Sequence, residues 1–400
     1  MWWDKTKIHL NVLFQGDKSV SIKIKYLHSV LLLFITLNSF YFFNMTLPSI
    51  VAAIAFIFLT LCKNNEYKLF SGGSIAFWFM LVLFFWSSFG LFFLSVEIDG
   101  KRLLFFILSL VFIFSLTLSS KNLDIRFTFK FCLLVHVVLF YLQFTIYYCG
   151  GGYLNYLEPF GLESRNFGGE FSPLGNIQLM RSSGLFNEPG TYACFVAPLI
   201  AFFMNYVESK ADKIVFILST LTLLLTFSTF GIVFFAILII SFGKNSVFKF
   251  FLIILGGVIS SPYIIWRFFS SSITSADSGV DFRWEYISAI FEKLNNLAFL
   301  AFGEGGLSLN TFEFEVHGAD NDAGLVFFMM YNLGFLPTVC LISLILFVSI
   351  NSGKIKTLIP IFIVLISKIS FYSIVFPLFL FIFFSNCENR ESKFQLDEEI

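Results

Sequence analysis

The sequence predicts an all-α, polytopic integral membrane protein, and its composition and long apolar runs are the main reasons. Of the 400 residues, 57% are hydrophobic and only 13% are charged, and the mean hydropathy is +0.84. Several apolar runs reach the roughly 20 residues that an α-helix needs to cross a bilayer. The formal net charge of +0 argues against a nucleic-acid partner, because proteins that bind phosphate backbones carry a basic face. We therefore expect a single membrane domain over residues 1–400.

Apolar segments alternate with polar turns along the whole chain. About twelve spans are expected, near 26–45, 47–62, 74–94, 103–118, 129–148, 190–207, 213–228, 230–242, 248–265, 323–350, 355–370 and 372–386. Two long polar loops interrupt this series, the first at 149–189 and the second at 266–322. No separate soluble domain is expected.

Basic residues occur in every second turn, which predicts the orientation of the spans. They lie in the N-terminal tail and in the turns that hold Lys63 and Lys68, Lys121 to Lys130, Lys210 and Lys213, Lys244 and Lys249, and Lys354 and Lys356. By the positive-inside rule these turns are cytoplasmic. Both termini are then expected inside and both long loops outside. The outer turn 95–102 is an exception, since it carries Lys101 and Arg102.

Arginine is concentrated in the two long loops. They hold four of the seven arginines, Arg165, Arg181, Arg267 and Arg283, but only one of the nineteen lysines. The second loop is nevertheless acidic overall. A guanidinium group binds phosphate or carboxylate through two parallel hydrogen bonds, so we expect site-specific anion recognition instead of a general basic patch. Ordinary pairing of these arginines with loop glutamates is the alternative.

The end of the first loop has the pattern of a polar helix entrance. It reads Arg181-Ser-Ser-Gly-Leu-Phe-Asn-Glu-Pro-Gly-Thr-Tyr-Ala193 and leads into an apolar segment. Asn187 can cap the helix, Glu188 suits the positive end of the helix dipole, and Pro189 is tolerated in a first turn. This entrance is a candidate site.

The second loop predicts an amphipathic helix near 281–300, capped by Asp281. Its expected apolar stripe consists of Ile287, Ile290, Leu294 and Leu297. Arg283 lies on the same face in the first turn, so packing of the stripe onto the membrane or the helix bundle carries Arg283 inward. Further along, the polar run His317-Gly-Ala-Asp320-Asn321-Asp322 precedes the next span; Asp320 and Asn321 either cap that helix or take part in a site.

Two ionisable side chains fall inside expected spans. His136 is interpreted as a neutral histidine that hydrogen-bonds a neighbouring helix, with a proton relay as the alternative. Lys368 lies near the outer end of its span and is expected to extend its amine toward the membrane surface, with contact to a lipid phosphate as the alternative.

Several of these patterns together resemble those of bacterial O-antigen polymerases of the Wzy type and the related O-antigen ligases. The first is Arg181-x-x-Gly-x-Phe-x-Glu-Pro-x-x-x-Ala193; the others are Arg283-Trp284, Gly303 to Gly306, and Asp320-Asn321 with Leu325 and Gly334 downstream. Two positions depart from the family pattern. Thr229 stands where the family commonly has arginine, and Asp320 stands where ligases typically have histidine. The second departure favours polymerase over ligase.

The resemblance implies a GT-C-like architecture in the bacterial inner membrane, with the active site facing the periplasm. The implied reaction joins oligosaccharide repeat units carried on undecaprenyl pyrophosphate, which serve as donor and acceptor, and releases the lipid pyrophosphate. A chain-length regulator is a candidate protein partner, and no cofactor or metal is expected. The product is O antigen, capsule or another surface polysaccharide. The alternatives are a ligase that transfers glycan to lipid A–core, and a lipid-linked oligosaccharide flippase or other transporter.

The implied site roles follow from this chemistry. Arg181 and Arg283 would bind the departing pyrophosphate, and Glu188 would orient Arg181. Arg165, Arg267 and Asn321 are further candidates for substrate binding. The general base is expected to be His317, whose ordinary pKa of about 6.5 suits the task, with Asp320 in reserve.

Overall fold

The structure is a computed structural model that describes residues 18–37, 40–42, 45–62, 72–119, 123–162, 164, 180–242, 246–269, 279–308, 320–351 and 358–388. The helices that position the site are α6 (Ile125–Ile146), α7 (Pro189–Met204), α8 (Lys210–Leu225), α9 (Thr229–Ser241), α10 (Ser246–Phe269), α11 (Gly279–Lys293), η4 (Asp320–Ala323), α13 (Leu325–Leu333), α14 (Phe335–Asn351) and α15 (Leu358–Ile366). The others are α2 (Lys18–Thr36), α3 (Leu47–Cys62), α4 (Gly72–Leu94), α5 (Gly100–Ser119), η2 (Tyr147–Gly151), η3 (Glu158–Phe160), α12 (Leu297–Phe302) and α16 (Val375–Glu388). A two-residue hairpin pairs β1 (Tyr41–Phe42) with β2 (Met45–Thr46).

The expected helical class is confirmed, and the membrane character is supported in part. Within the described ranges, three helical stretches are long and apolar enough to cross a membrane: Ser74–Leu94, Gly100–Ser119 and Ile125–Gly150. Other apolar helices have 10 to 17 residues. The expected number of about twelve spans is therefore not confirmed by helix length. Most helices do coincide with the apolar segments of the sequence, because such runs bury or shield their backbone groups best as helices.

The outer face of α4 also has the character of a membrane-facing surface. Trp78, Val82, Phe85 and Phe89 lie at helical spacing along it, and each is 57–59% exposed. A stripe of large apolar side chains on the surface is rare in a protein that is surrounded by water. The stripe fits a helix that faces hydrocarbon.

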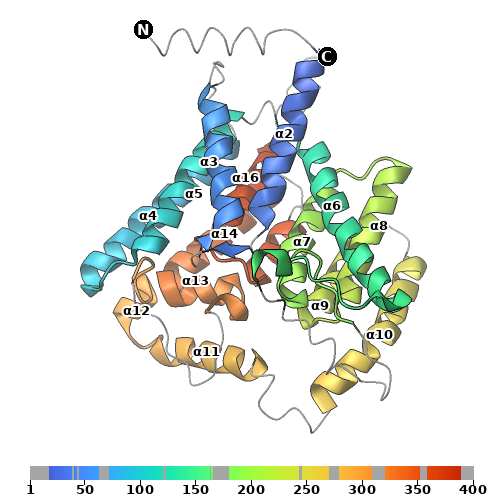
Figure 1. Cartoon of the computed structure of the whole chain (residues 1–400). Coiled ribbons are helices and arrows are strands. Elements are labelled where there is room, and N and C mark those ends of the chain that lie inside the picture. The colour runs from blue at the N-terminus through green and yellow to red at the C-terminus, as the bar shows by residue number, and fades with distance from the viewer. Residues whose placement is uncertain are drawn as a thin grey trace.

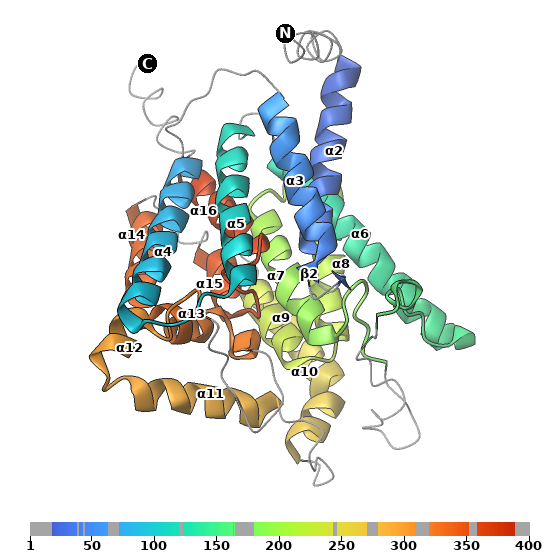
Figure 2. The same cartoon turned by 60° about the vertical axis from the view of Figure 1, so that its left-hand side comes forward.

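Helix α7 forms the centre of the bundle (Figures 1 and 2). Thirteen of its 16 residues are buried, and it packs against α6, α8, α9 and α15. A helix that is apolar on all sides is expected in a core, where every face has a partner. The first turn of α7 is therefore surrounded by the ends of neighbouring helices, and this is where the polar entrance of the sequence lies.

Helix α11 lies across one end of the bundle, beyond the ends of α4 and α5 (Figure 2). It begins at Gly279, two residues before Asp281, so Asp281 is inside the helix and is not its cap. It ends at Lys293, and Asn296 caps the separate helix α12 through its side chain. The expected single helix to residue 300 is thus two helices. The expected stripe also fails at Leu297, which is 81% exposed.

The buried side of α11 consists of Tyr286 and Ile290, which pack with Tyr331 of α13. Arg283 precedes Tyr286 by three residues, so it lies near this inward face, as expected. The long apolar segment 323–350 is split into α13 and α14 at Gly334. A Cβ there would lie 2.6 Å from the carbonyl carbon of Ala301, so the close approach of the α12 backbone requires glycine.

A cationic cluster at the ends of the core helices

The loop that precedes α7 is held in place by one glutamine of α6. The side-chain oxygen of Gln143 accepts hydrogen bonds from the Ser182 hydroxyl at 2.6 Å and from the backbone N–H groups of Ser183 and Gly184 at 3.0 Å each. The Gln143 amide nitrogen donates to the carbonyl oxygen of Leu154 at 2.7 Å. A buried amide with all these bonds satisfied gives the loop one defined conformation.

Two further residues of the same motif have structural roles. Gly184 has a φ of +54°, and a Cβ on it would lie 3.3 Å from the ring of Tyr192. Phe186 is fully buried and packs against Tyr192 and Phe195 of α7. The segment from Arg181 to Phe186 is therefore a turn that is fixed in its middle by Gly184 and at its end by Phe186. These two contacts hold Arg181 in one position.

Glu188 is the N-cap residue of α7, with Pro189 in the first turn. Asn187 was expected to cap this helix, and that prediction is wrong by one residue. Glu188 occupies the N-cap position through its extended backbone, and its side chain makes no capping hydrogen bond to the helix, so the usual preference for asparagine at this position did not identify it. The carboxylate of Glu188 accepts a hydrogen bond from the Thr191 hydroxyl at 2.9 Å and lies at the positive end of the helix dipole.

The side chain of Arg181 extends from the loop before α7 toward α10. Its Nε donates to the carbonyl oxygen of Phe227 at 3.1 Å, and its guanidinium carbon lies 5.5 Å from the centre of the Tyr263 ring. Burial lowers the pKa of Arg181 from its usual value, while Tyr263 and Glu188 oppose this effect. An arginine stays protonated in proteins, so the result is a partly desolvated cation.

Thr229 is the residue that stands in place of the arginine common in the resembled family. Its hydroxyl lies 3.4 Å from that of Tyr263, the tyrosine that stacks on Arg181. Next to it, the Phe230 ring lies 4.9 Å from the guanidinium carbon of Arg283 and 5.9 Å from the Lys368 amine. The first turn of α9 thus lies between the three cations.

Arg283 and Asp322 connect α11 to the short helix η4. The Nε of Arg283 donates to the backbone oxygen of Asp322 at 3.0 Å. The side chain of Asp322 is directed to a different partner, the Lys368 amine, at 2.9 Å. The segment after η4 is also tied to the Lys368 loop, because the Leu325 N–H donates to the Ser367 oxygen at 2.8 Å.

Lys368 lies in the loop between α15 and α16 and joins the two halves of the cluster. Its amine is 2.7 Å from Glu188 and 2.9 Å from Asp322, and its side chain is only 11% exposed. Burial alone would lower the pKa of Lys368, but Glu188 and Asp322 outweigh it and raise the pKa above the ordinary value. The expectation that Lys368 extends its amine to the membrane surface is therefore wrong.

We call Arg181, Arg283 and Lys368, with Glu188 and Asp322, the cationic cluster. Three positive and two negative side chains meet there, so the cluster carries one net positive charge before any ligand binds. The N-termini of α7 and α9 add positive dipole ends at the same place. Such an arrangement suits a ligand with two or more negative charges, and the two arginines can offer planar, two-pronged hydrogen bonding.

The remaining predicted site residues cannot be placed by the structure. Arg165 and His317 lie outside the described residues, as do the side chains of Arg267, Asp320 and Asn321. The backbone of Asp320 and Asn321 forms η4, the helix that also carries Asp322. Two groups of the cluster escaped the sequence-based site prediction, Lys368 and Asp322. The sequence signal for the lysine was a charge near the outer end of an expected span, for which contact with a lipid phosphate was only the alternative interpretation.

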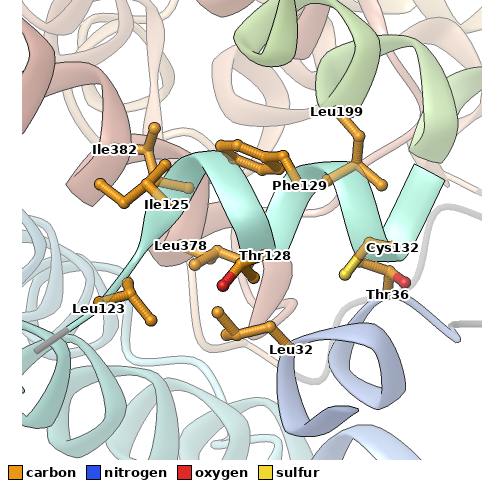
Figure 3. Close-up of a pocket in the computed structure, with 10 residues that line it drawn as sticks. All are labelled: Leu32, Thr36, Leu123, Ile125, Thr128, Phe129, Cys132, Leu199, Leu378 and Ile382. Atoms are coloured by element: carbon orange, nitrogen blue, oxygen red, sulfur yellow. The ribbon is translucent and has the colours of Figure 1, made fainter. Parts of the chain in front are cut away.

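His136 and a small cavity lie away from the cluster. The Nε2 of His136 is 3.0 Å from the Thr36 hydroxyl of α2, as expected for a histidine bonded to a neighbouring helix. Thr36 also lines a mostly apolar cavity of about 10 Å³, beside Thr128 and Cys132 of α6 (Figure 3). Thr128 precedes Gln143 by 15 residues, about 22 Å along a helix, so this cavity is not part of the site.

Fold and site together define a helical protein with membrane-spanning character and a largely buried cluster of three cationic and two anionic side chains. In the described part of the chain, no group of three or more His, Cys, Asp or Glu side chains is arranged to hold a metal ion. Comparisons with known protein families, with curated proteins and with solved structures found no match for this chain.

Proposed function

We propose that this protein polymerises oligosaccharide repeat units linked to undecaprenyl pyrophosphate, at the outer face of a bacterial inner membrane. Each cycle transfers a growing glycan from its lipid pyrophosphate to a hydroxyl group of another lipid-linked unit. The product is O antigen or a related surface polysaccharide. This proposal combines the resemblance of the sequence motifs with the chemistry of the cationic cluster.

The observation that carries the proposal is the convergence of Arg181 and Arg283 on one cluster. The two arginines belong to different long loops, yet they lie on either side of the first turn of α9. Lys368 adds a third cation from a position 180 residues beyond Glu188. A pyrophosphate leaving group gains negative charge as the glycosidic bond breaks, and fixed cations around it stabilise that charge.

The reaction needs two further elements. Attack by the acceptor hydroxyl on the anomeric carbon requires a group that removes its proton, and His317 is the first candidate, with Asp320 in reserve. The arginines hold the departing lipid pyrophosphate, while Glu188 and Asp322 keep Lys368 in place beside it. Proton transfer and leaving-group stabilisation are thereby assigned to different residues.

The proposal includes a GT-C-like arrangement of about twelve spans with both termini in the cytoplasm. The cluster then faces the periplasm, where α11 lies along the membrane surface. Reporter fusions at the two long loops test this orientation. Either loop in the cytoplasm would contradict it.

Deletion of the gene in the organism that encodes it tests the function. A gel of the surface glycan should then show single repeat units and no long polymer. Long polymer that accumulates on the carrier lipid would indicate a ligase. Loss of even single attached units would indicate a flippase. An unchanged polymer ladder would contradict all three assignments.

A further inference from the structure

An apolar groove opens on the side of the bundle next to the cationic cluster. It is formed by Ile237 of α9, by residues 342–346 of α14 and by residues 358–365 of α15, and its volume is about 330 Å³. Its lining side chains are all isoleucine, leucine or phenylalanine. Such walls offer no hydrogen bonds, so they suit a hydrocarbon chain.

One end of the groove lies near the cluster along α15. Leu365, at one end of it, precedes Lys368 by three residues, and α9 begins at Thr229 next to Phe230. From Phe230 to Ile237 the rise along the helix is about 10 Å. The groove therefore leads away from the cations along the side of the bundle, toward the middle of the expected membrane span.

The groove is also open to the side. Its floor is buried, with Ile345 and Ile361 each 1% exposed, whereas its rim is not, with Leu346 at 43% and Phe362 at 52%. A ligand that already lies in the membrane can enter through this opening without crossing water.

We infer that this groove holds the hydrocarbon chain of the lipid pyrophosphate whose head group the cationic cluster binds. The inference rests on the proposed function and extends it to the lipid part of the substrate. Charge complementarity selects this occupant, because the net positive cluster at one end of the groove calls for a ligand with an anionic head and a long apolar tail. The hydrocarbon chain of the lipid in the groove sets the direction of approach, so that the pyrophosphate arrives at Arg283 and Lys368 from the membrane side.

The test measures binding of two probes, sugar-free undecaprenyl pyrophosphate and inorganic pyrophosphate, to the purified protein in detergent. Ile237→Trp and Leu346→Trp each place an indole ring in the groove from a different helix. Ile240→Trp and Phe347→Trp are matched controls on the same two helices, at positions 58% and 64% exposed that do not line the groove. Thermal unfolding confirms that all four variants are folded.

The groove variants should bind undecaprenyl pyrophosphate at least ~10-fold more weakly than the controls, because displacement of two or three buried methylene groups has that effect. Their affinity for inorganic pyrophosphate should not change. Equal affinity of groove and control variants for the lipid would overturn the inference. So would competition by phosphatidylglycerol at equal concentration, since an ordinary membrane lipid would then be the occupant.

The proposed function can fail separately. If the groove variants lose the lipid but wild-type protein forms no glycosidic bonds from lipid-linked repeat units, the lipid site stands and the polymerase assignment falls. If polymerisation occurs and the groove variants bind the lipid normally, the polymerase assignment stands and the lipid site falls.

Discussion

Lys368 and Glu188 form an ion pair of 2.7 Å across 180 positions of the chain. The pair links the loop before α16 to the first turn of the central helix α7. Because Asp322 binds the same amine, the lysine also connects the end of the second long loop. One side chain thus holds together three segments that bear the cationic cluster.

Replacement of Lys368 by methionine should destabilise the protein. The change leaves Glu188 and Asp322 close together without their cation. Loss of one partner of a buried ion pair costs about 3–5 kcal/mol, and partial exposure of the two carboxylates reduces this to about 2–3 kcal/mol. Thermal unfolding in detergent measures the effect, and Lys368→Arg should restore most of the loss.

The Lys293–Glu304 pair supplies the control, because its lysine is 40% exposed. Lys293→Met should cost less than about 1 kcal/mol, the usual contribution of an exposed pair. Equal destabilisation by the two lysine substitutions would mean that Lys368 does not stabilise the protein as a buried partner of Glu188 and Asp322.

The contribution of Lys368 to the stability of the folded protein should decrease at high pH. Glu188 and Asp322 raise the pKa of Lys368 despite its burial, so its folded pKa lies above the unfolded value of about 10.4. Stabilisation of this sign is fully present below the unfolded pKa and is lost as the pH rises through the folded pKa. The difference in unfolding temperature between wild type and Lys368→Met should stay constant from about pH 7 to 10 and shrink above that. A difference that already shrinks near neutral pH would show that Lys368 is not a charged partner of the carboxylates.

The helices could largely be predicted from the sequence, whereas the cluster could not. Apolar runs such as 47–62 predicted α3 at its observed bounds, because length and hydropathy suffice to recognise a helix of this kind. The partners of Lys368 come from tertiary packing, and no local pattern indicates contacts between residues 180 positions apart. Arg181 and Arg283 were found because arginine is concentrated in the loops.

Other differences have local causes. Gly334 has a φ of +101° and lies against the backbone of Ala301, and this close packing breaks an apolar run that reads as one span. Gln143 was passed over because a single polar residue in an apolar helix does not reveal its partner. The three groups that donate hydrogen bonds to its side-chain oxygen belong to the motif that the sequence did single out.

Gln143→Leu should therefore impair the site although Gln143 is a positioning residue. Three donors in the Ser182–Gly184 loop would lose their acceptor, at about 1–3 kcal/mol for each group that stays buried without a partner. We expect a lower unfolding temperature and, for protein that is still folded, a reduced kcat with a smaller change in KM.

Gln143→Glu tests whether the acceptor oxygen is what matters. It keeps the acceptors for the loop while losing the donor to Leu154, so it should recover part of the kcat. If Gln143→Glu is as inactive as Gln143→Leu while equally stable, the loop is not positioned in the way described.

The general base can be assigned by the pH dependence of polymerisation. His317→Ala should be nearly inactive from about pH 5.5 to 8.5, because histidine is the side chain whose ordinary pKa lies in this range. Asp320→Asn should keep the wild-type profile with an altered maximum. Polymerisation by His317→Ala at close to the wild-type rate would transfer the role to Asp320 or to a mechanism driven by leaving-group stabilisation.

The central claim is that the cationic cluster stabilises a departing lipid pyrophosphate, and Arg181→Lys tests it most directly. Lysine keeps the positive charge but lacks the two-pronged geometry of the guanidinium group. Purified protein in liposomes is supplied with undecaprenyl-pyrophosphate-linked repeat units, and new glycosidic bonds and released undecaprenyl pyrophosphate are measured together. Arg126→Lys is the control, since Arg126 pairs with Asp212 and Glu208 away from the cluster.

Wild type and Arg126→Lys should release one lipid pyrophosphate for each bond formed. Arg181→Lys should be slower by about 30- to 1,000-fold, equivalent to about 2–4 kcal/mol of lost transition-state stabilisation. Bond formation by Arg181→Lys at the wild-type rate, or wild-type protein that releases no lipid pyrophosphate, would contradict the account.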